Sequence, residues 1–273
     1  PTPPVIVRPG TAVPSAPPAP PPLPLGPTLW TSTPVSVGEN GVTNLAIRLN
    51  TGFRISGHFV FDGTLPKPAP SVVQTLSVLI QPIDGHQAGF AVAFNSRVDP
   101  DGTFTTYEVP PGRYSIRMAA FADSWQALQG WTFESSVADG RDAAGKPFNL
   151  AGNVTDLVIT MTDHPMEISG TVRDSDGKPD PTAAVIVFSA DRNDWSNFGE
   201  TPRRMRYLKP TRAGGYRVAS LPPGDYYVAA VPDSQAGDWQ DPRFLQTLSR
   251  SAALVTVAKG EKKTQDVVTK SAR

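Results

Sequence analysis

The sequence predicts an all-β protein made of two tandem β-sandwiches behind an extended, proline-rich N-terminal arm. Thirty prolines and 23 glycines in 273 residues interrupt helices and supply turns. Short stretches alternate apolar and polar residues with the two-residue period of half-buried strands. A long internal repeat shows that one such unit occurs twice.

The N-terminal arm comprises residues 1–29, which hold 12 of the 30 prolines. This composition predicts polyproline II or coil rather than a packed core. Within the arm, Val5, Ile6 and Val7 form a small apolar island. Either the stretch is a linker, or it is an arm that docks on the sheet of a neighbouring molecule through these three residues.

The repeat has an offset of 112 to 113 residues. Residues 42–57, VTNLAIRLNTGFRISG, match residues 154–170, VTDLVITMTDHPMEISG. The pattern of the strand that closes each copy recurs a third time at residues 262–270, KKTQDVVTK. Because this pattern occurs three times around two complete bodies, its first occurrence either completes the first sandwich or is the tail of an earlier repeat in a longer tandem array.

The expected boundaries follow from the repeat. We expect the arm over residues 1–29, the first sandwich over residues 30–163 and the second over residues 164–273. The first range includes the strand that either completes this sandwich or belongs to a preceding repeat.

Individual strands are indicated by their pattern. In residues 44–49, Leu45, Ile47 and Leu49 alternate with less apolar residues, which predicts a half-buried strand. Residues 183–188, AAVIVF, are apolar on both faces, as in a central strand. Residues 241–252 place apolar side chains at helical spacing, so a short helix and a coil remain alternatives there.

Two similar corners interrupt the strands, EVPPGRY and SLPPGDY. The second proline suits the second position of a type II turn, and the glycine suits the positive φ of the third. The tyrosine two residues later is expected to place its ring against the core. The corner residues are Pro111, Gly112, Tyr114, Pro223, Gly224 and Tyr226.

Residues 168–188, ISGTVRDSDGKPDPTAAVIVF, and 214–231, GGYRVASLPPGDYYVAAV, resemble a carboxypeptidase regulatory-like domain. The first body is similar to the same family, with a longer insertion. This resemblance implies transthyretin-like, Ig-like sandwiches of exported bacterial proteins, secreted or at the cell surface. It also implies an accessory module without catalytic residues, since related modules serve as stalks, adhesin repeats, pilin domains and sugar-binding domains.

Several function classes are disfavoured by composition. The 25 basic and 25 acidic residues give a net charge of zero, which argues against a nucleic-acid partner. No apolar run is long enough to predict a membrane span. There is no cysteine, so neither a disulfide nor a thiolate metal site is expected.

No catalytic, cofactor-binding or metal-binding residues are expected, and we predict that the chain is not an enzyme. His164 and Glu167 have the spacing of a zinc-binding pair, but in a strand they face opposite sides, and no histidine follows them. The acidic turns at residues 99–102 and 174–180 fit ordinary turn chemistry, with a weak calcium site as the alternative.

Two tryptophans stand out in loop-like stretches. Trp195 and Trp239 lie close to aspartates, so they are candidates for contact with a glycan or a protein partner. The alternative is that each closes an end of its sandwich. The basic run RRMRYLK, residues 203–209, is interpreted as a solvated face.

These observations favour a non-catalytic, exported structural module. We expect a subunit of a cell-surface or extracellular filament-like assembly, with the arm contacting a neighbour and a homo-oligomer or polymer forming through the arm and the sheet edges. The alternatives are a carbohydrate-binding or adhesion module with a polysaccharide partner, and an accessory domain of a larger enzyme.

Overall fold

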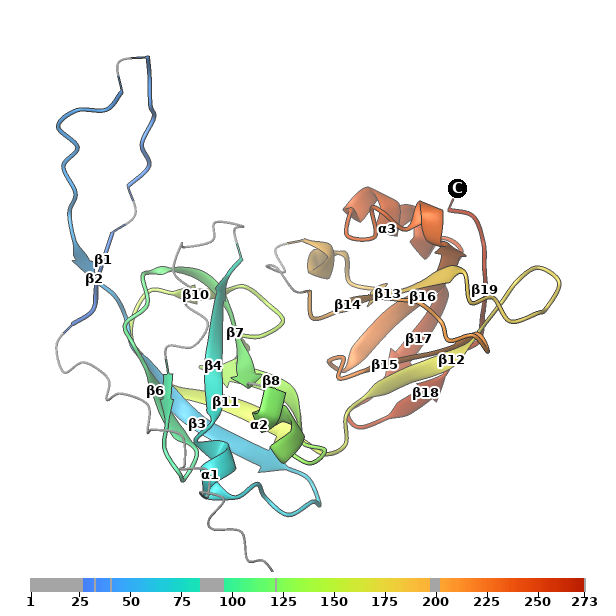
Figure 1. The fold of residues 1–273 in the computed structure, drawn as a ribbon, viewed down its shortest axis with the longest axis horizontal. Helices are drawn as coiled ribbons and strands as arrows, with labels where there is room; N and C mark the ends of the chain where they lie inside the picture. The colour runs from blue at the N-terminus through green and yellow to red at the C-terminus, as the bar shows by residue number, and fades with distance from the viewer. Residues whose placement is uncertain are drawn as a thin grey trace, which may run out of the picture.

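The computed structural model describes residues 27–83, 96–196 and 202–272, apart from Ser32, Asn40 and Phe121. The described chain is all-β, with only short helices between strands (Figure 1). The arm residues expected to dock on a neighbour, Val5, Ile6 and Val7, lie outside the described residues.

The elements of the N-terminal half precede Asp163. They are β1 (Leu29–Trp30), β2 (Asn50–Thr51), β3 (Ile55–Asp62), α1 (Pro70–Val73), β4 (Leu76–Pro82), β5 (Ser96–Val98), β6 (Thr103–Thr106), β7 (Gly112–Ala120), α2 (Ala122–Ala127), β8 (Thr132–Ala138), β9 (Arg141–Asp142), β10 (Phe148–Leu150) and β11 (Val154–Thr162).

The elements of the C-terminal half begin at Glu167. They are β12 (Glu167–Arg173), β13 (Ala183–Ser189), the 3-10 helix η1 (Arg192–Trp195), β14 (Met205–Leu208), β15 (Gly215–Ala219), β16 (Gly224–Pro232), the 3-10 helix η2 (Asp233–Gln235), α3 (Pro242–Ser249), β17 (Ala253–Val257), β18 (Lys262–Thr264) and β19 (Val267–Val268).

The first sandwich, residues 52–163, consists of two sheets. One has the strand order β10-β7-β4, and the other has the order β5-β6-β3-β11-β8-β9. Ile55, Ile116 and Leu157, from strands of both sheets, are fully buried in one hydrophobic cluster. The strands alternate buried and exposed residues because only one face of each sheet meets this core.

The second sandwich, residues 164–272, pairs the sheet β15-β12-β18, extended by β19, with the sheet β14-β13-β16-β17. All seven residues of β13 are buried, as its two-sided apolar sequence predicts. Val185 faces the core between the sheets, whereas Phe188 faces a second cluster under η1 and α3. The helical alternative for residues 241–252 is therefore correct, and the Asp241 side chain caps α3.

The closing strand of each sandwich runs parallel to the opening strand. β11 pairs in parallel with β3, and β18 and β19 pair in parallel with β12. A Cβ atom added at Gly57 would lie 1.8 Å from the carbonyl oxygen of Leu157, and one at Gly170 would lie 2.0 Å from that of Gln265. The repeated Ile-Ser-Gly of the opening strands thus includes a glycine because the closing strand approaches its backbone.

The predicted half-buried strand at residues 44–49 is not observed. Leu45, Ile47 and Leu49 are 49%, 58% and 56% exposed, and these residues form no strand. They lie in a long hairpin-like segment, residues 30–51, which projects from the first sandwich above β1 and β2 (Figure 1). We call this segment the ribbon. The prediction fails because the place beside each described opening strand is already filled by another closing strand.

Candidate functional site: the contact between the two sandwiches

The two corners are structural, but their geometry differs from the type II turn expected from sequence. Gly224 has φ of 150°, and Gly112 does not have positive φ. The tyrosine hydroxyl instead donates to the carbonyl oxygen of the first proline, Tyr114 to Pro110 at 3.0 Å and Tyr226 to Pro222 at 2.6 Å.

Glycine leaves room at the first corner for the tyrosine ring, which lies over it. A Cβ atom at Gly112 would lie 3.1 Å from the ring of Tyr114. At Gly224 the nearest neighbour of an added Cβ atom is the guanidinium of Arg204, at 3.2 Å. The second corner therefore lies beside Arg204, which belongs to the charged cluster between the two sandwiches.

The two loop tryptophans differ in their surroundings. Trp195 is 3% exposed, and its indole nitrogen donates to the carbonyl oxygen of Ser189 at 2.7 Å. Its ring packs edge-on against Phe188, so it closes the sandwich and presents no free face for a sugar ring. Trp239 is half-buried, with its ring 6.0 Å from that of Tyr207.

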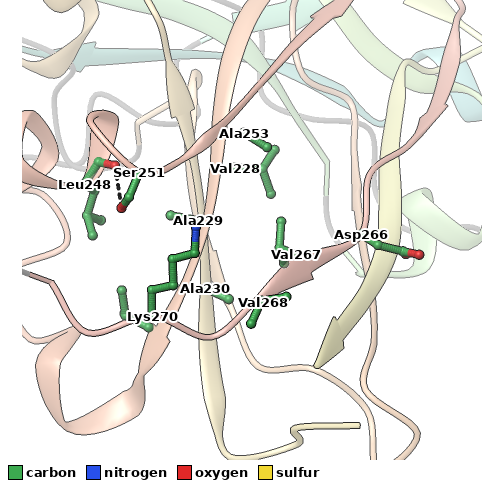
Figure 2. Close-up of a pocket in the computed structure, with 11 residues that line it drawn as sticks. Val228, Ala229, Ala230, Leu248, Ser251, Ala253, Asp266, Val267, Val268 and Lys270 are labelled. Atoms are coloured by element: carbon green, nitrogen blue, oxygen red, sulfur yellow. Dashed lines mark hydrogen bonds between the residues drawn. The ribbon is translucent and has the colours of Figure 1, made fainter. Parts of the chain in front are cut away.

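A cleft of about 230 Å³ lies between β16, β19 and the end of α3 (Figure 2). Small apolar side chains such as Ala229, Ala230 and Val267 form most of its wall. The Asp266 carboxylate points away from the cleft and accepts hydrogen bonds from Thr171. The cleft therefore lacks the convergent polar groups of a reactive site.

His164 and Glu167 do not converge on a common point. Glu167 is paired with Arg217 at 2.7 Å, and His164 pairs with Asp163. Across the described ranges, no group of three or more potential ligands is placed to hold a metal ion. None of the described helices has the length and hydropathy needed to cross a membrane.

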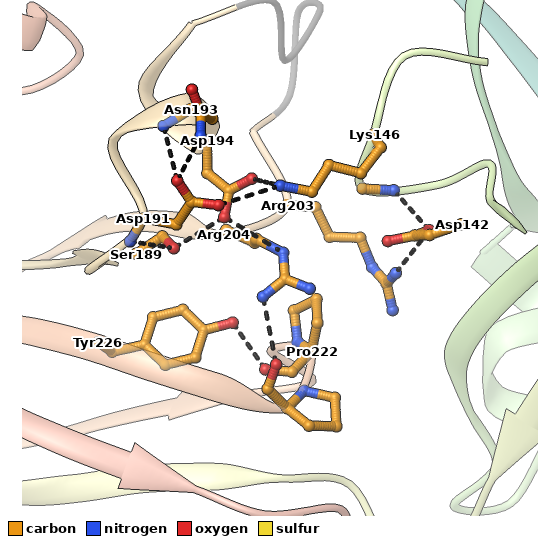
Figure 3. A network of polar contacts seen from close by, with 12 residues as sticks. Asp142, Lys146, Ser189, Asp191, Asn193, Asp194, Arg203, Arg204, Pro222 and Tyr226 are labelled. Carbon is orange, nitrogen blue, oxygen red and sulfur yellow. Dashed lines mark hydrogen bonds and ion pairs between the residues drawn. The ribbon is translucent and has the colours of Figure 1, made fainter.

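The main polar cluster lies where the sandwiches meet (Figure 3). Asp194 and Arg203 are buried, at 8% and 6% exposed, and the side chain of Asp163, in the connection between the sandwiches, is buried too. Asp142 and Lys146 come from the first sandwich and face Asp194 and Arg203. We call this set the interface network.

Asp194 is the centre of the interface network. Its carboxylate accepts hydrogen bonds from Lys146 and, at 2.8 Å, from the Ser189 hydroxyl, and it lies 3.6 Å from the guanidinium of Arg204. Burial alone would lower the pKa of Lys146, but its bonds to Asp194 and Asp191 outweigh this effect, and the pKa is raised. Lys146 therefore stays charged at neutral pH and ties the first sandwich to the second.

Arg203 crosses the interface in the other direction. Its guanidinium lies 4.8 Å from the ring centroid of Phe133 and 3.9 Å from the Asp142 carboxylate, both in the first sandwich. Burial lowers the pKa of Arg203 to about 10, against the attraction of Asp142, so the side chain remains a cation at neutral pH. Cation–π contacts of this kind gain strength when water is excluded.

A second group of charged contacts also joins the two sandwiches. Lys259 of the second sandwich is 2.8 Å from Asp62 and 3.2 Å from Glu134, both of the first sandwich. The chain itself joins the sandwiches through residues 163–166, between β11 and β12. The covalent connection and the charged contacts thus both join the first sandwich to the second.

The interpretation of residues 203–209 as a solvated face is wrong for the arginines. Arg203 is buried, Arg204 donates to the carbonyl oxygen of Pro223 at 3.2 Å, and Arg206 donates to carbonyl oxygens of the same turn. The arginine run was visible in the sequence. Asp142 and Phe133, the partners of Arg203, belong to the other sandwich, and no local pattern connects them.

Comparisons with known proteins give only distant likenesses. No protein-family model and no curated protein matches the chain. The minor pilin of Streptococcus agalactiae is 14% identical over 80% of this chain and 96% of its own, with a TM-score of 0.31. The major pilin subunit of Bacillus cereus is 10% identical over 85% and 76%, with a TM-score of 0.29.

Enzyme domains also occur among the similar structures. A dioxygenase domain from a carbohydrate-binding fusion protein of a Streptomyces species is 16% identical over 40% of this chain and 80% of its own, with a TM-score of 0.25. At such identities and TM-scores, neither the pilins nor the dioxygenase domain carries an argument about what this chain does.

Proposed function

We propose that the chain is a non-catalytic, exported structural module in which two sandwiches are held as one rigid spacer. The observation that supports this proposal is the interface network. Two buried charged residues, Asp194 and Arg203, join one sandwich to the other instead of facing a cavity. Buried charges of this kind fix an orientation, and removal of one partner is costly.

The proposal includes a place at the cell surface, in a filament-like assembly of many copies. The carboxypeptidase regulatory-like resemblance supports export from a bacterial cell. Edge strands provide places for lateral contact: β17 ends the sheet β14-β13-β16-β17, and its Leu254 is 59% exposed. A head-to-tail contact that does not close would extend into a fibre.

The arm supplies the proposed contact between copies. Its apolar island, Val5, Ile6 and Val7, would pack on the neighbouring subunit, with the prolines keeping the arm extended. Preorganisation by proline reduces the entropy lost when such a segment binds.

Assembly of the full chain tests this proposal. Sedimentation velocity and electron microscopy should show polymers of the unmodified chain, and deletion of residues 1–27 should abolish them. Replacement of Val5, Ile6 and Val7 by aspartate should have the same effect, whereas aspartate at Thr2 and Thr11 serves as a matched control and should leave assembly intact. Unchanged polymers after the deletion would contradict the role of the arm.

A further inference from the structure

We propose that residues 30–51 are the last two strands of another sandwich of the same repeat, which precedes the first sandwich in the polypeptide. The sandwich that the ribbon would complete does not depend on the proposed place of the chain at the cell surface. It also moves the start of the first sandwich from Trp30 to residue 52.

The first observation is a contrast between two copies of one sequence pattern. Residues 42–49, VTNLAIRL, match residues 154–161, VTDLVITM. In β11, Leu157, Ile159 and Met161 are all 0% exposed. Their counterparts in the ribbon are about half exposed, which is unusual for three large apolar side chains in alternation.

The second observation is that a further strand of the repeat accompanies this one. Trp30 and Thr31 match Trp131 and Thr132, which lead into β8, if the connection to the closing strand is 11 residues shorter than in the first sandwich. In the first sandwich β8 pairs antiparallel with β11, and Thr132 lies opposite Thr162.

The base of the ribbon is also an antiparallel pair, in a shifted register. β1 pairs antiparallel with β2, and Trp30 lies opposite Asn50. The counterparts of Thr132 and Thr162 are Thr31 and Asn50, so the register is shifted by one residue, and the pairing has to slip by one when these strands join a sandwich. The base of the ribbon is thus already arranged as a pair of adjacent strands of a sandwich sheet.

The order of elements along the chain identifies which sandwich is completed. β8 and β11 are neighbours in the larger sheet of the first sandwich, with the short strands β9 and β10 between them along the chain, and residues 163–166 then lead from β11 into β12, the opening strand of the second. In the same way, Trp30 and Asn50 lie in paired strands, and the chain then leads into β3, the opening strand of the first. The ribbon therefore stands where the closing strands of a preceding sandwich belong.

The parallel place beside each described opening strand is already taken. β3 has β11 as its parallel partner, and β12 has β18 and β19. A second copy of the chain has the same occupied places, so the ribbon could act as a closing strand there only by displacing β11, or β18 and β19. The occupant is therefore a sandwich with its own Ile-Ser-Gly-type opening strand, whose glycine permits close approach of the closing strand, as Gly57 and Gly170 do.

The direct test extends the chain. A copy of residues 52–129 is joined to Leu29 in place of the arm, so that residues 29–51 take the position that residues 130–163 have in the first sandwich. Hydrogen–deuterium exchange should slow at least 100-fold at residues 43–50, to within tenfold of residues 155–162. Fast exchange at residues 43–50 in the extended chain would overturn the proposal.

A matched control uses the same extension with Gly57→Ala in the added copy alone. Because the added Cβ atom blocks the closing strand, protection at residues 43–50 should be lost there. In the unextended chain these residues should exchange fast at every concentration. Protection that increases with protein concentration would identify a second copy as the occupant and contradict the proposal.

A second variant keeps the proposal testable if the extended unit does not fold. Four substitutions in the unextended chain, Asp156→Asn, Val158→Ala, Thr160→Arg and Met161→Leu, give β11 the sequence of residues 42–49. The first sandwich should remain folded, with a Tm decrease below about 5 °C. Loss of its folded state would show that this sequence cannot act as a closing strand, and would overturn the proposal.

Discussion

Substitution of Gly57 by alanine tests how the closing strand is held. The added Cβ atom would lie 1.8 Å from the backbone oxygen of Leu157, and Cβ atoms do not approach other atoms within 3.0 Å, so β11 has to move by roughly 1.2 Å. Such overpacking costs about 1–3 kcal/mol, and each weakened ladder hydrogen bond adds about 1 kcal/mol. We expect the first sandwich to lose about 3 kcal/mol of unfolding free energy.

Urea denaturation followed by hydrogen exchange measures this loss separately for each sandwich. Gly152→Ala is the matched control, because nothing lies within 4 Å of its added Cβ atom, and its effect should stay within about 0.5 kcal/mol. The second sandwich should keep its stability in both variants. If Gly57→Ala lies within about 1 kcal/mol of the unmodified chain, the close approach of β11 to β3 does not have the role assigned to it.

Three further predictions concern the second sandwich. Tyr226→Phe should lower its unfolding free energy by about 1–2 kcal/mol, because the Pro222 carbonyl oxygen loses its donor in a buried site. Asp194→Ala should cost about 2 kcal/mol, since it leaves the interface network without its central carboxylate. The stability should also fall below about pH 4. Hydrogen bonds from Thr171 lower the pKa of Asp266 in the folded state beneath its ordinary value. The stabilisation by these bonds is therefore fully present above the ordinary pKa and is lost as the pH falls and Asp266 is protonated.

Controls separate these effects from general damage. Lys209→Ala removes an exposed ion pair with Asp233 and should cost less than about 1 kcal/mol, unlike Asp194→Ala. Asp266→Asn should flatten the acid dependence measured by thermal unfolding between pH 7 and 3. An unchanged pH profile, or equal losses for Asp194→Ala and Lys209→Ala, would refute the corresponding assignment.

Sequence patterns predicted those elements that pack against neighbours within the same sandwich. The two-sided apolar run of β13 indicated a covered strand, and the spacing of Leu245 and Leu248 was compatible with the helix that covers it. The repeated tyrosines of the corners also pointed to the core. The turn type was predicted incorrectly, because at the first corner the glycine makes room for the tyrosine ring instead of supplying a type II turn.

Elements that depend on a second unit could not be predicted in this way. The alternation in residues 42–49 equals that of β11, but a pattern does not show whether a sheet is present to receive it. The burial of Arg203 depends on Phe133 and Asp142, which lie on another sandwich. The local sequence of a basic run does not distinguish an exposed face from a buried interface.

The central claim, that the two sandwiches form one rigid spacer, is tested most directly by a distance measurement between them. Because the chain has no cysteine, the exposed positions Thr155 and Leu254 can be changed to cysteine and spin-labelled without competing sites. Pulsed electron paramagnetic resonance should give one narrow distance distribution, which broadens when Arg203 and Lys259 are both replaced by alanine. A broad distribution in the chain with an intact interface network would contradict the claim.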